Sequence, residues 1–262
     1  MKILIVSGFL GAGKTTFIKR LARNVDQRFA ILENEYGAAG IDGARLGQNR
    51  QGTQKNVWEM TEQCICCIGK KDFAASVLTI ANVVDPEYLI VEPTGVGSLA
   101  RIIENLRQIE YERIQLLSPV TIVDVYSYRR YMAEYPELYQ DQIRSADTII
   151  VSKTEACQAE EKQRIQKFLQ EINPQAKIIT DYASTMTRED YQSLLLGGRY
   201  EKEVQDTQSG EKMPETFSFE NIRMEAPETL WCFLEQIIRG AFGNIIRAKG
   251  QFAAGDQFLQ FD

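Results

Sequence analysis

The chain has 262 residues, of which 44% are hydrophobic and 25% are charged, and its formal net charge is −6. These values are ordinary for a globular protein with a sizeable core, and the negative charge argues against non-specific binding to nucleic acids or anionic membranes. No apolar run reaches the roughly 18 residues of a membrane-spanning helix, and the apolar run at the start is too short for a secretory signal, so we expect a cytoplasmic protein.

Short apolar runs alternate with amphipathic segments over the first 180 residues. The run KILIVS at 2–7 is typical of a strand that is covered on both faces. Strands are predicted at 2–7, 30–32, 56–60, 88–91, 120–125, 148–152 and 177–180. Helices are predicted at 16–24, 70–82, 99–107 and 159–172. This alternation predicts an α/β fold with a doubly wound, mostly parallel sheet.

The pattern changes near residue 197. Residues 197–215 are polar and contain glycine, as in a linker or long loop. Beyond them we predict strands and one helix in βαββ order, at 216–224, 227–242, 245–252 and 257–261. The predicted organisation is therefore a large domain at 1–196, a linker at 197–215 and a small α+β domain at 216–262. A βαββ unit this short buries little apolar surface by itself. We therefore expect it to pack on the first domain or on a partner.

A phosphate-binding motif follows the first strand. GFLGAGKT at 8–15 fits G-x4-G-K-[ST], with a predicted strand before it and a predicted helix after it. The glycines let backbone N–H groups turn toward a phosphate, and the helix N-terminus adds a favourable dipole. Lys14 is expected at the β- and γ-phosphates and Thr15 at Mg²⁺. The expected nucleotide-binding residues of this loop are Gly8, Gly11, Ala12, Gly13, Lys14, Thr15 and Thr16.

Two acidic segments are candidates to complete this site. Glu92 ends a predicted buried strand and can reach Mg²⁺ through water. Gly95, three residues later, can donate its N–H to a γ-phosphate and change conformation when that phosphate leaves. The earlier segment ENEYGAAGID at 33–42 favours a loop that orders around Mg²⁺ and the γ-phosphate, although acidic loops are also common as solvated surface.

The segment EQCICCIG at 62–69 holds Cys64, Cys66 and Cys67. Three thiolates can hold Zn²⁺ or another borderline-soft ion and leave a fourth position open, as suits a carrier. The chain has no histidine, so any fourth protein ligand must be a cysteine, a carboxylate or backbone. A redox or sulfur-handling role and inert buried thiols remain the alternatives. Cys157 and Cys232 are expected to be core thiols.

Five segments, in their order along the chain, resemble the CobW-like family of P-loop GTPases and metallochaperones, which is related to HypB and UreG: GFLGAGKTT, ENEYGAAGID, CICC, VEPTG and IIRAKG. The resemblance implies Mg²⁺-dependent GTP hydrolysis coupled to binding of a transition metal, Zn²⁺ or Co²⁺. The implied partners are GTP or GDP and a client metalloprotein. A second copy of the chain, forming a homodimer, is a further candidate partner. The roles it implies are catalysis by Lys14, Glu35 and Glu92, Mg²⁺ binding by Thr15, Glu35 and Glu92, and transition-metal binding by Cys64, Cys66 and Cys67.

The chain departs from this family in four ways, one of which is that it has no histidine and so lacks the histidine-rich stretch of some relatives. The base-reading motif N-K-x-D appears here as SKTE, in which Lys153 can stack on a base and Ser152 offers less than an asparagine amide. Glu155 can accept from the N–H groups of guanine, which favours GTP over ATP. Gln63 stands where the family often has glycine, whose backbone reaches conformations that are costly for glutamine. The C-terminal domain is also shorter than in the family.

These observations favour an enzyme that acts as a switch, with GTP hydrolysis changing the geometry of the thiols and releasing metal to a client. The alternative is an adaptor that docks on a metallo- or corrinoid-dependent enzyme and uses nucleotide only to time assembly. A small-molecule kinase ranks last because no substrate-lid segment is evident.

Overall fold

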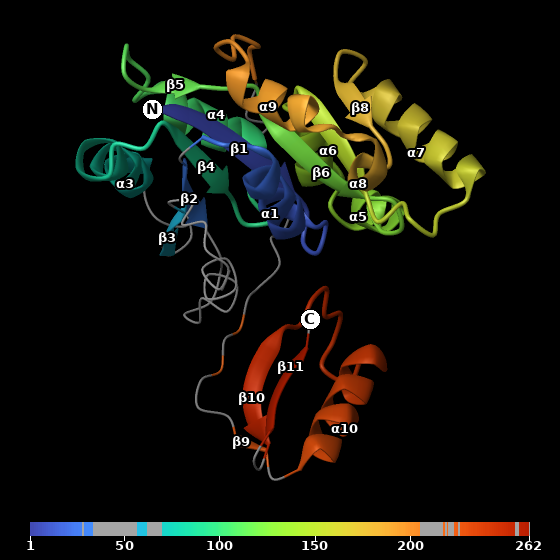
Figure 1. The fold of residues 1–262 in the computed structure, drawn as a ribbon. Coiled ribbons are helices and arrows are strands. Elements are labelled where there is room, and N and C mark those ends of the chain that lie inside the picture. The colour runs from blue at the N-terminus through green and yellow to red at the C-terminus, as the bar shows by residue number, and fades with distance from the viewer. Residues whose placement is uncertain are drawn as a thin grey trace. The chain divides into compact units, whose positions relative to one another are not determined.

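The computed structural model describes residues 1–27, 29–33, 57–61, 70–204, 217, 219, 223–224, 226–254 and 257–261. The described residues up to 204 belong to one compact unit, and those from 217 onward belong to a second (Figure 1). In this described part of the chain, no helix has the length and apolar character needed to cross a membrane.

The first unit is built around a parallel sheet. Its strands are β1 (Lys2–Gly8), β2 (Phe29–Glu33), β3 (Val57–Thr61), β4 (Tyr88–Glu92), β5 (Gln115–Leu116), β6 (Val120–Asp124), β7 (Thr148–Ser152) and β8 (Lys177–Ile179). Their order is β3-β2-β4-β1-β6-β7-β8, with β5 also paired to β1, and all these pairings are parallel. Strand order reverses beside β1, and such a point at the carboxyl edge of a parallel sheet is where doubly wound folds bind ligands. The predicted fold class is confirmed.

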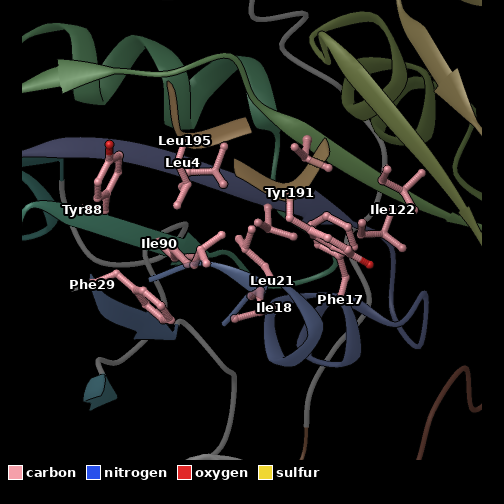
Figure 2. Packing of buried hydrophobic residues seen from close by; sticks show 14 of the residues in the cluster. Leu4, Phe17, Ile18, Leu21, Phe29, Tyr88, Ile90, Ile122, Tyr191 and Leu195 are labelled. Atoms are coloured by element: carbon pink, nitrogen blue, oxygen red, sulfur yellow. The ribbon is translucent and has the colours of Figure 1, made fainter. Parts of the chain in front are cut away.

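Helices cover both faces of this sheet. They are α1 (Lys14–Asn24), α3 (Lys70–Val83), α4 (Leu99–Arg107), α5 (Tyr128–Glu134), α6 (Pro136–Arg144), α7 (Ala159–Ile172), α8 (Tyr182–Thr185) and α9 (Arg188–Leu196). Successive residues of a strand point to opposite faces. Ile3 and Ile5 of β1 accordingly join a cluster with α3 and α4, whereas Leu4 joins a cluster with α1, α8 and α9. Figure 2 shows Leu4 in the second cluster, with Phe17 of α1 and Tyr191 of α9.

Part of the predicted linker is packed in the structure. Tyr200 is buried, and its hydroxyl donates a 2.8 Å hydrogen bond to the carbonyl of Ser145. Lys202 donates a 2.8 Å hydrogen bond from Nζ to the carbonyl of Arg144, and Arg107 donates to the carbonyl of Lys202. The described residues 197–204 therefore continue the first unit, because two of their side chains bind the end of α6 and one of their carbonyls accepts from the end of α4.

The second unit has the βαββ order, with β9 (Arg223–Met224), α10 (Pro227–Ile238), β10 (Gly250–Ala254) and β11 (Gln257–Phe261). β10 pairs antiparallel with β11 and parallel with β9. Leu230 of α10 packs against Leu234, Leu259 and Phe261. The predicted helix at 227–242 is too long: α10 ends at Ile238, and Gly240 follows with φ 75°, a left-handed conformation that stops a helix. The strand predicted at 245–252 begins only at Gly250.

Candidate nucleotide-binding site

The loop between β1 and α1 has the backbone of a phosphate cradle. Gly13 is the N-cap of α1 with φ 98°, a left-handed conformation that favours glycine. It supplies no side-chain cap, so the N–H groups at the start of α1 can bind an anion instead. Gly8 needs to be glycine for another reason, because a Cβ there would collide with the carbonyl oxygen of Ile122 on β6.

Lys14 is buried, with 8% of its surface exposed. Its Nζ donates to the carbonyls of Gly8, at 3.0 Å, and Phe9, at 3.4 Å. The ammonium is thus held by the backbone of the phosphate loop itself. A buried cation at the N-terminus of a helix is suited to a polyanionic ligand such as a nucleoside triphosphate.

The hydroxyl of Thr15 and the carboxylate of Glu92 meet at the end of β4. Thr15 Oγ1 donates a 2.9 Å hydrogen bond to Glu92 Oε1. The structure therefore brings together two of the three oxygen donors expected for Mg²⁺, and this donor set fits a hard cation. Glu33 is buried and ends β2 in register with Glu92, which adds a second carboxylate at this edge of the sheet.

The loop after β4 lies directly on the phosphate loop. A Cβ on Gly95 would lie 2.5 Å from the backbone nitrogen of Leu10, so only glycine permits this approach. On its other side, Gln142 of α6 donates from Nε2 to the carbonyls of Gly95 and Gly97. Sequence reasoning missed Gln142, because nothing near it in the sequence marks contact with residues more than forty positions away.

The SKTE segment begins at the carboxyl end of β7. The hydroxyl of Ser152 donates to the carbonyl of Ala12, at 2.6 Å, and so ties the predicted base site to the phosphate loop. Lys153 has φ 59°, a left-handed backbone conformation that is uncommon for residues other than glycine. Residues in such strained conformations cluster at functional sites. The Nζ of Lys153 lies 2.7 Å from Oδ2 of Asp124, a buried residue that the sequence analysis did not select. Glu155 is exposed, as a group that reads a base requires.

Four predicted site residues, namely Glu35, Cys64, Cys66 and Cys67, lie outside the described residues, as does Gln63. Within the described ranges, no group of three or more Asp, Glu or Cys side chains could hold a metal ion. The prediction that Cys232 is a core thiol is wrong, since it is exposed on α10, whose buried residue is Leu230. Cys157 is only partly buried.

Comparisons with known proteins agree with this geometry. Residues 2–180 match the family described as "CobW/HypB/UreG, nucleotide-binding domain". The chain is 30% identical over 178 residues to the zinc chaperone YeiR of Escherichia coli, a match that covers 67% of this chain and 53% of that protein. It is 27% identical over 194 residues to the zinc chaperone CobW of Pseudomonas aeruginosa, over 63% of this chain and 52% of that protein. The chain thus spans about half the length of the curated relatives it matches.

Solved structures share the fold. The Zn(II)-bound YjiA GTPase of Escherichia coli superimposes with a TM-score of 0.56 at 18% identity, over 100% of this chain and 86% of that chain. The hydrogenase maturation factor HypB of Archaeoglobus fulgidus superimposes with a TM-score of 0.51 at 17% identity, over 75% of this chain and 89% of that chain. Both support the P-loop NTPase fold that the phosphate cradle and strand order indicate. The family match over residues 2–180 shows that the chain belongs to the CobW/HypB/UreG nucleotide-binding domain family.

Proposed function

We propose that the chain is a Mg²⁺-dependent GTP hydrolase that binds Zn²⁺ or Co²⁺ at the C-x-C-C cluster at 64–67 and delivers it to a client metalloprotein. One observation carries the proposal, the register across three neighbouring strands. Thr61 of β3 pairs with Glu33 of β2, and Glu33 pairs with Glu92 of β4. The chain therefore enters the cysteine segment at the edge of the sheet that carries the expected Mg²⁺ carboxylate.

Different residues would bind the phosphates and the Mg²⁺ ion of the nucleotide. Lys14 and the backbone N–H groups of the phosphate loop would hold the β- and γ-phosphates, while Thr15 and Glu92 would hold Mg²⁺. When bound, Mg²⁺ neutralises charge on the phosphate oxygens. Glu35 is the further acid proposed for this site. The reaction is attack of water on the γ-phosphate, with GDP and inorganic phosphate as products.

Guanine is the proposed base. Lys153 would stack on the base through its aliphatic stem, and Glu155 would accept from the guanine N–H groups. Ser152 would not donate to the base, because its single hydroxyl proton is already given to the carbonyl of Ala12. The names of the relatives, zinc chaperones and a GTPase, support the same nucleotide and metal.

Metal delivery requires that the nucleotide changes the affinity of the cluster. The coupling between two ligands is reciprocal. If bound GTP raises the affinity of the cluster for metal, bound metal must raise the affinity for GTP by the same factor. The test is titration of purified protein with Zn²⁺ and with Co²⁺ in the presence of a GTP analogue, GDP, an ATP analogue or no nucleotide. Different metal affinities with GTP analogue and GDP are expected, and equal affinities would refute the coupling.

A cysteine variant tests the location of the metal. The C66A/C67A protein is expected to lose stoichiometric metal binding while it keeps nucleotide binding, since the phosphate loop is untouched. The matched control is C157A/C232A, which removes the two thiols that lie outside the cluster and is expected to bind metal normally. Unchanged metal stoichiometry in C66A/C67A would place the metal elsewhere. Binding to a client that depends on nucleotide but not on these cysteines would favour the adaptor instead.

A further inference from the structure

A buried glutamine of α6 holds the loop that follows β4. Gln142 is 1% exposed, and its Nε2 donates to the carbonyl of Gly95 at 3.0 Å and to that of Gly97 at 2.9 Å. Both partners are carbonyl oxygens, so the NH₂ end of the amide must face them. The other end, Oε1, is buried and receives no hydrogen bond from any residue that the structure describes. Burying a half-satisfied amide is unfavourable, so fold stability alone does not explain a glutamine here.

The helix that carries Gln142 is anchored to the sheet and to α4. The main-chain carbonyl of Gln142 accepts a 2.9 Å hydrogen bond from Thr121 Oγ1 of β6. The neighbouring Asp141 accepts from the backbone N–H of Leu99, at 2.7 Å, at the start of α4. Gln142 and Asp141 together therefore fix the loop and the first turn of the helix that follows it.

The same loop is fixed on its opposite side by the phosphate loop. Gly95 lies so close to the backbone of Leu10 that no side chain fits between them. A turn in which Gly97 N–H donates to the carbonyl of Thr94, at 3.0 Å, limits the loop further. Gly95 is thus held between Leu10 and Gln142, and its peptide groups have little freedom to rotate unless one of these contacts is lost.

We propose that Gln142 is a positioning residue for GTP hydrolysis, which holds Gly95 so that its N–H meets the γ-phosphate. The inference rests on the proposed function, since it requires that Gly95 senses GTP and not GDP. Gln142 itself touches neither nucleotide nor water in this role. It acts by setting which way the Gly95 backbone faces, so its loss should affect the triphosphate state alone.

The first test replaces the amide with an apolar side chain of similar length. In Gln142→Met, affinity for a GTP analogue and the turnover rate are each expected to fall about tenfold, because two buried hydrogen bonds are lost. GDP affinity is expected to stay within about twofold, since GDP has no γ-phosphate to meet Gly95. The matched control is Gln140→Met on the same helix, which is expected to leave all three values unchanged. Equal losses for GTP analogue and GDP, or none, would overturn the proposal.

The second test uses Gln142→Glu, which keeps the size of the side chain. An ionised carboxylate cannot donate to the two carbonyls, whereas a protonated one can donate once, and burial among carbonyls raises its pKa. The turnover of Gln142→Glu relative to the wild type is therefore expected to rise as the pH falls from 8 to 6. A purely packing role would leave this ratio flat, which would also count against the proposal.

A third measurement separates this inference from the proposed function. Hydrogen exchange of the 93–98 segment in nucleotide-free protein is expected to be faster in Gln142→Met than in the wild type or Gln140→Met. This readout needs no GTP. If the wild type does not distinguish GTP analogue from GDP, the proposed function fails, while exchange still shows whether Gln142 holds the loop. Unchanged exchange would refute the positioning role itself.

Discussion

Thr15 Oγ1 donates a 2.9 Å hydrogen bond to Glu92 Oε1, which links the first turn of α1 to the carboxyl end of β4. The two residues are 77 positions apart in the sequence. Thr15 lies in the helix that follows β1, whereas Glu92 is the last residue of β4, and these two strands of the parallel sheet are direct neighbours. The pairing shows how the parallel register delivers a hydroxyl and a carboxylate to one point, where a hard cation is expected.

The first prediction concerns Glu92→Gln. The amide oxygen can still accept from Thr15, so the free energy of unfolding without nucleotide should change by less than about 1 kcal/mol. The lost charge should lower Mg²⁺-dependent nucleotide affinity by about tenfold to a hundredfold. Nucleotide titrations at several Mg²⁺ concentrations measure this, with Glu87→Gln as the control just before β4. An equal loss in the absence of Mg²⁺ would contradict a role for Glu92 at the ion.

The second prediction concerns Gly95→Ala. The new Cβ would lie 2.5 Å from the backbone nitrogen of Leu10, so the loop after β4 must move away from the phosphate loop. We expect a loss of about 1–3 kcal/mol in the free energy of unfolding. Binding of GTP analogue should weaken as well. The control is Gly198→Ala, where a Cβ meets nothing within 4 Å. Equal denaturant midpoints for the two variants would show that the close approach is absent in solution.

How far the sequence predicts this site depends on how local each signal is. The phosphate loop was predictable because one short motif contains its glycines, Lys14 and Thr15, and because strand and helix flank it. Glu92 was predictable because it ends an apolar run. Gln142 and Asp124 were not, since each acts through partners distant in the sequence and neither belongs to a motif.

The helices α5 and α6 were also not predicted, for a physical reason. Pro136 starts α6 two residues after α5 ends, so the segment 128–144 contains two short helices in place of one clear periodic run. In α5 the buried residues are Tyr128 and Tyr131. Tyrosine is common both in cores and at surfaces, so its presence in the sequence does not mark a buried helical face. Missing α6 meant missing the residue that holds the loop at Gly95.

The third prediction concerns the choice of base. If Glu155 accepts from guanine, Glu155→Ala should reduce the preference for GTP over ATP by about tenfold or more, because hydrogen bonds to a charged acceptor are strong. Glu155→Asp should keep the preference, since a carboxylate remains. Competition between labelled GTP and unlabelled ATP measures the ratio, with Glu160→Ala as an exposed control. An unchanged ratio in Glu155→Ala would assign guanine recognition to another group.

The fourth prediction concerns alkaline pH. Burial raises the pKa of Tyr200 to about 12, from 10.0. Between these values the unfolded chain has lost the proton and the folded chain has kept it, so the free energy of unfolding falls as pH rises. The contribution is complete below pH 10 and is lost as pH passes through the folded pKa. Burial also raises the pKa of Tyr139, Tyr182 and Tyr191, so their ionisation lowers the free energy of unfolding at alkaline pH as well.

Tyr200→Phe isolates this contribution. The variant loses the hydrogen bond to the carbonyl of Ser145, which should cost about 1 kcal/mol at pH 8. It also loses the ionisable group, so its free energy of unfolding should fall less steeply above pH 10 than that of the wild type. Urea unfolding at pH 8, 10 and 11 measures both effects. Parallel pH dependence in the two proteins would show that Tyr200 titrates normally in the fold.

The fifth prediction concerns the second unit, where Gly250 faces Phe261 across β10 and β11. A Cβ on Gly250 would lie 2.5 Å from the Phe261 ring, so Gly250→Ala must move that ring from its present position against Leu230. We expect a loss of about 1–3 kcal/mol, seen as faster hydrogen exchange in 250–261, with peptides of β1 and β6 as the internal control. Phe261→Leu provides a smaller side chain. In that background, Gly250→Ala should lower the free energy of unfolding much less than it does in the wild type. Additive effects in the double variant would mean that the glycine is needed for its backbone and not for the ring.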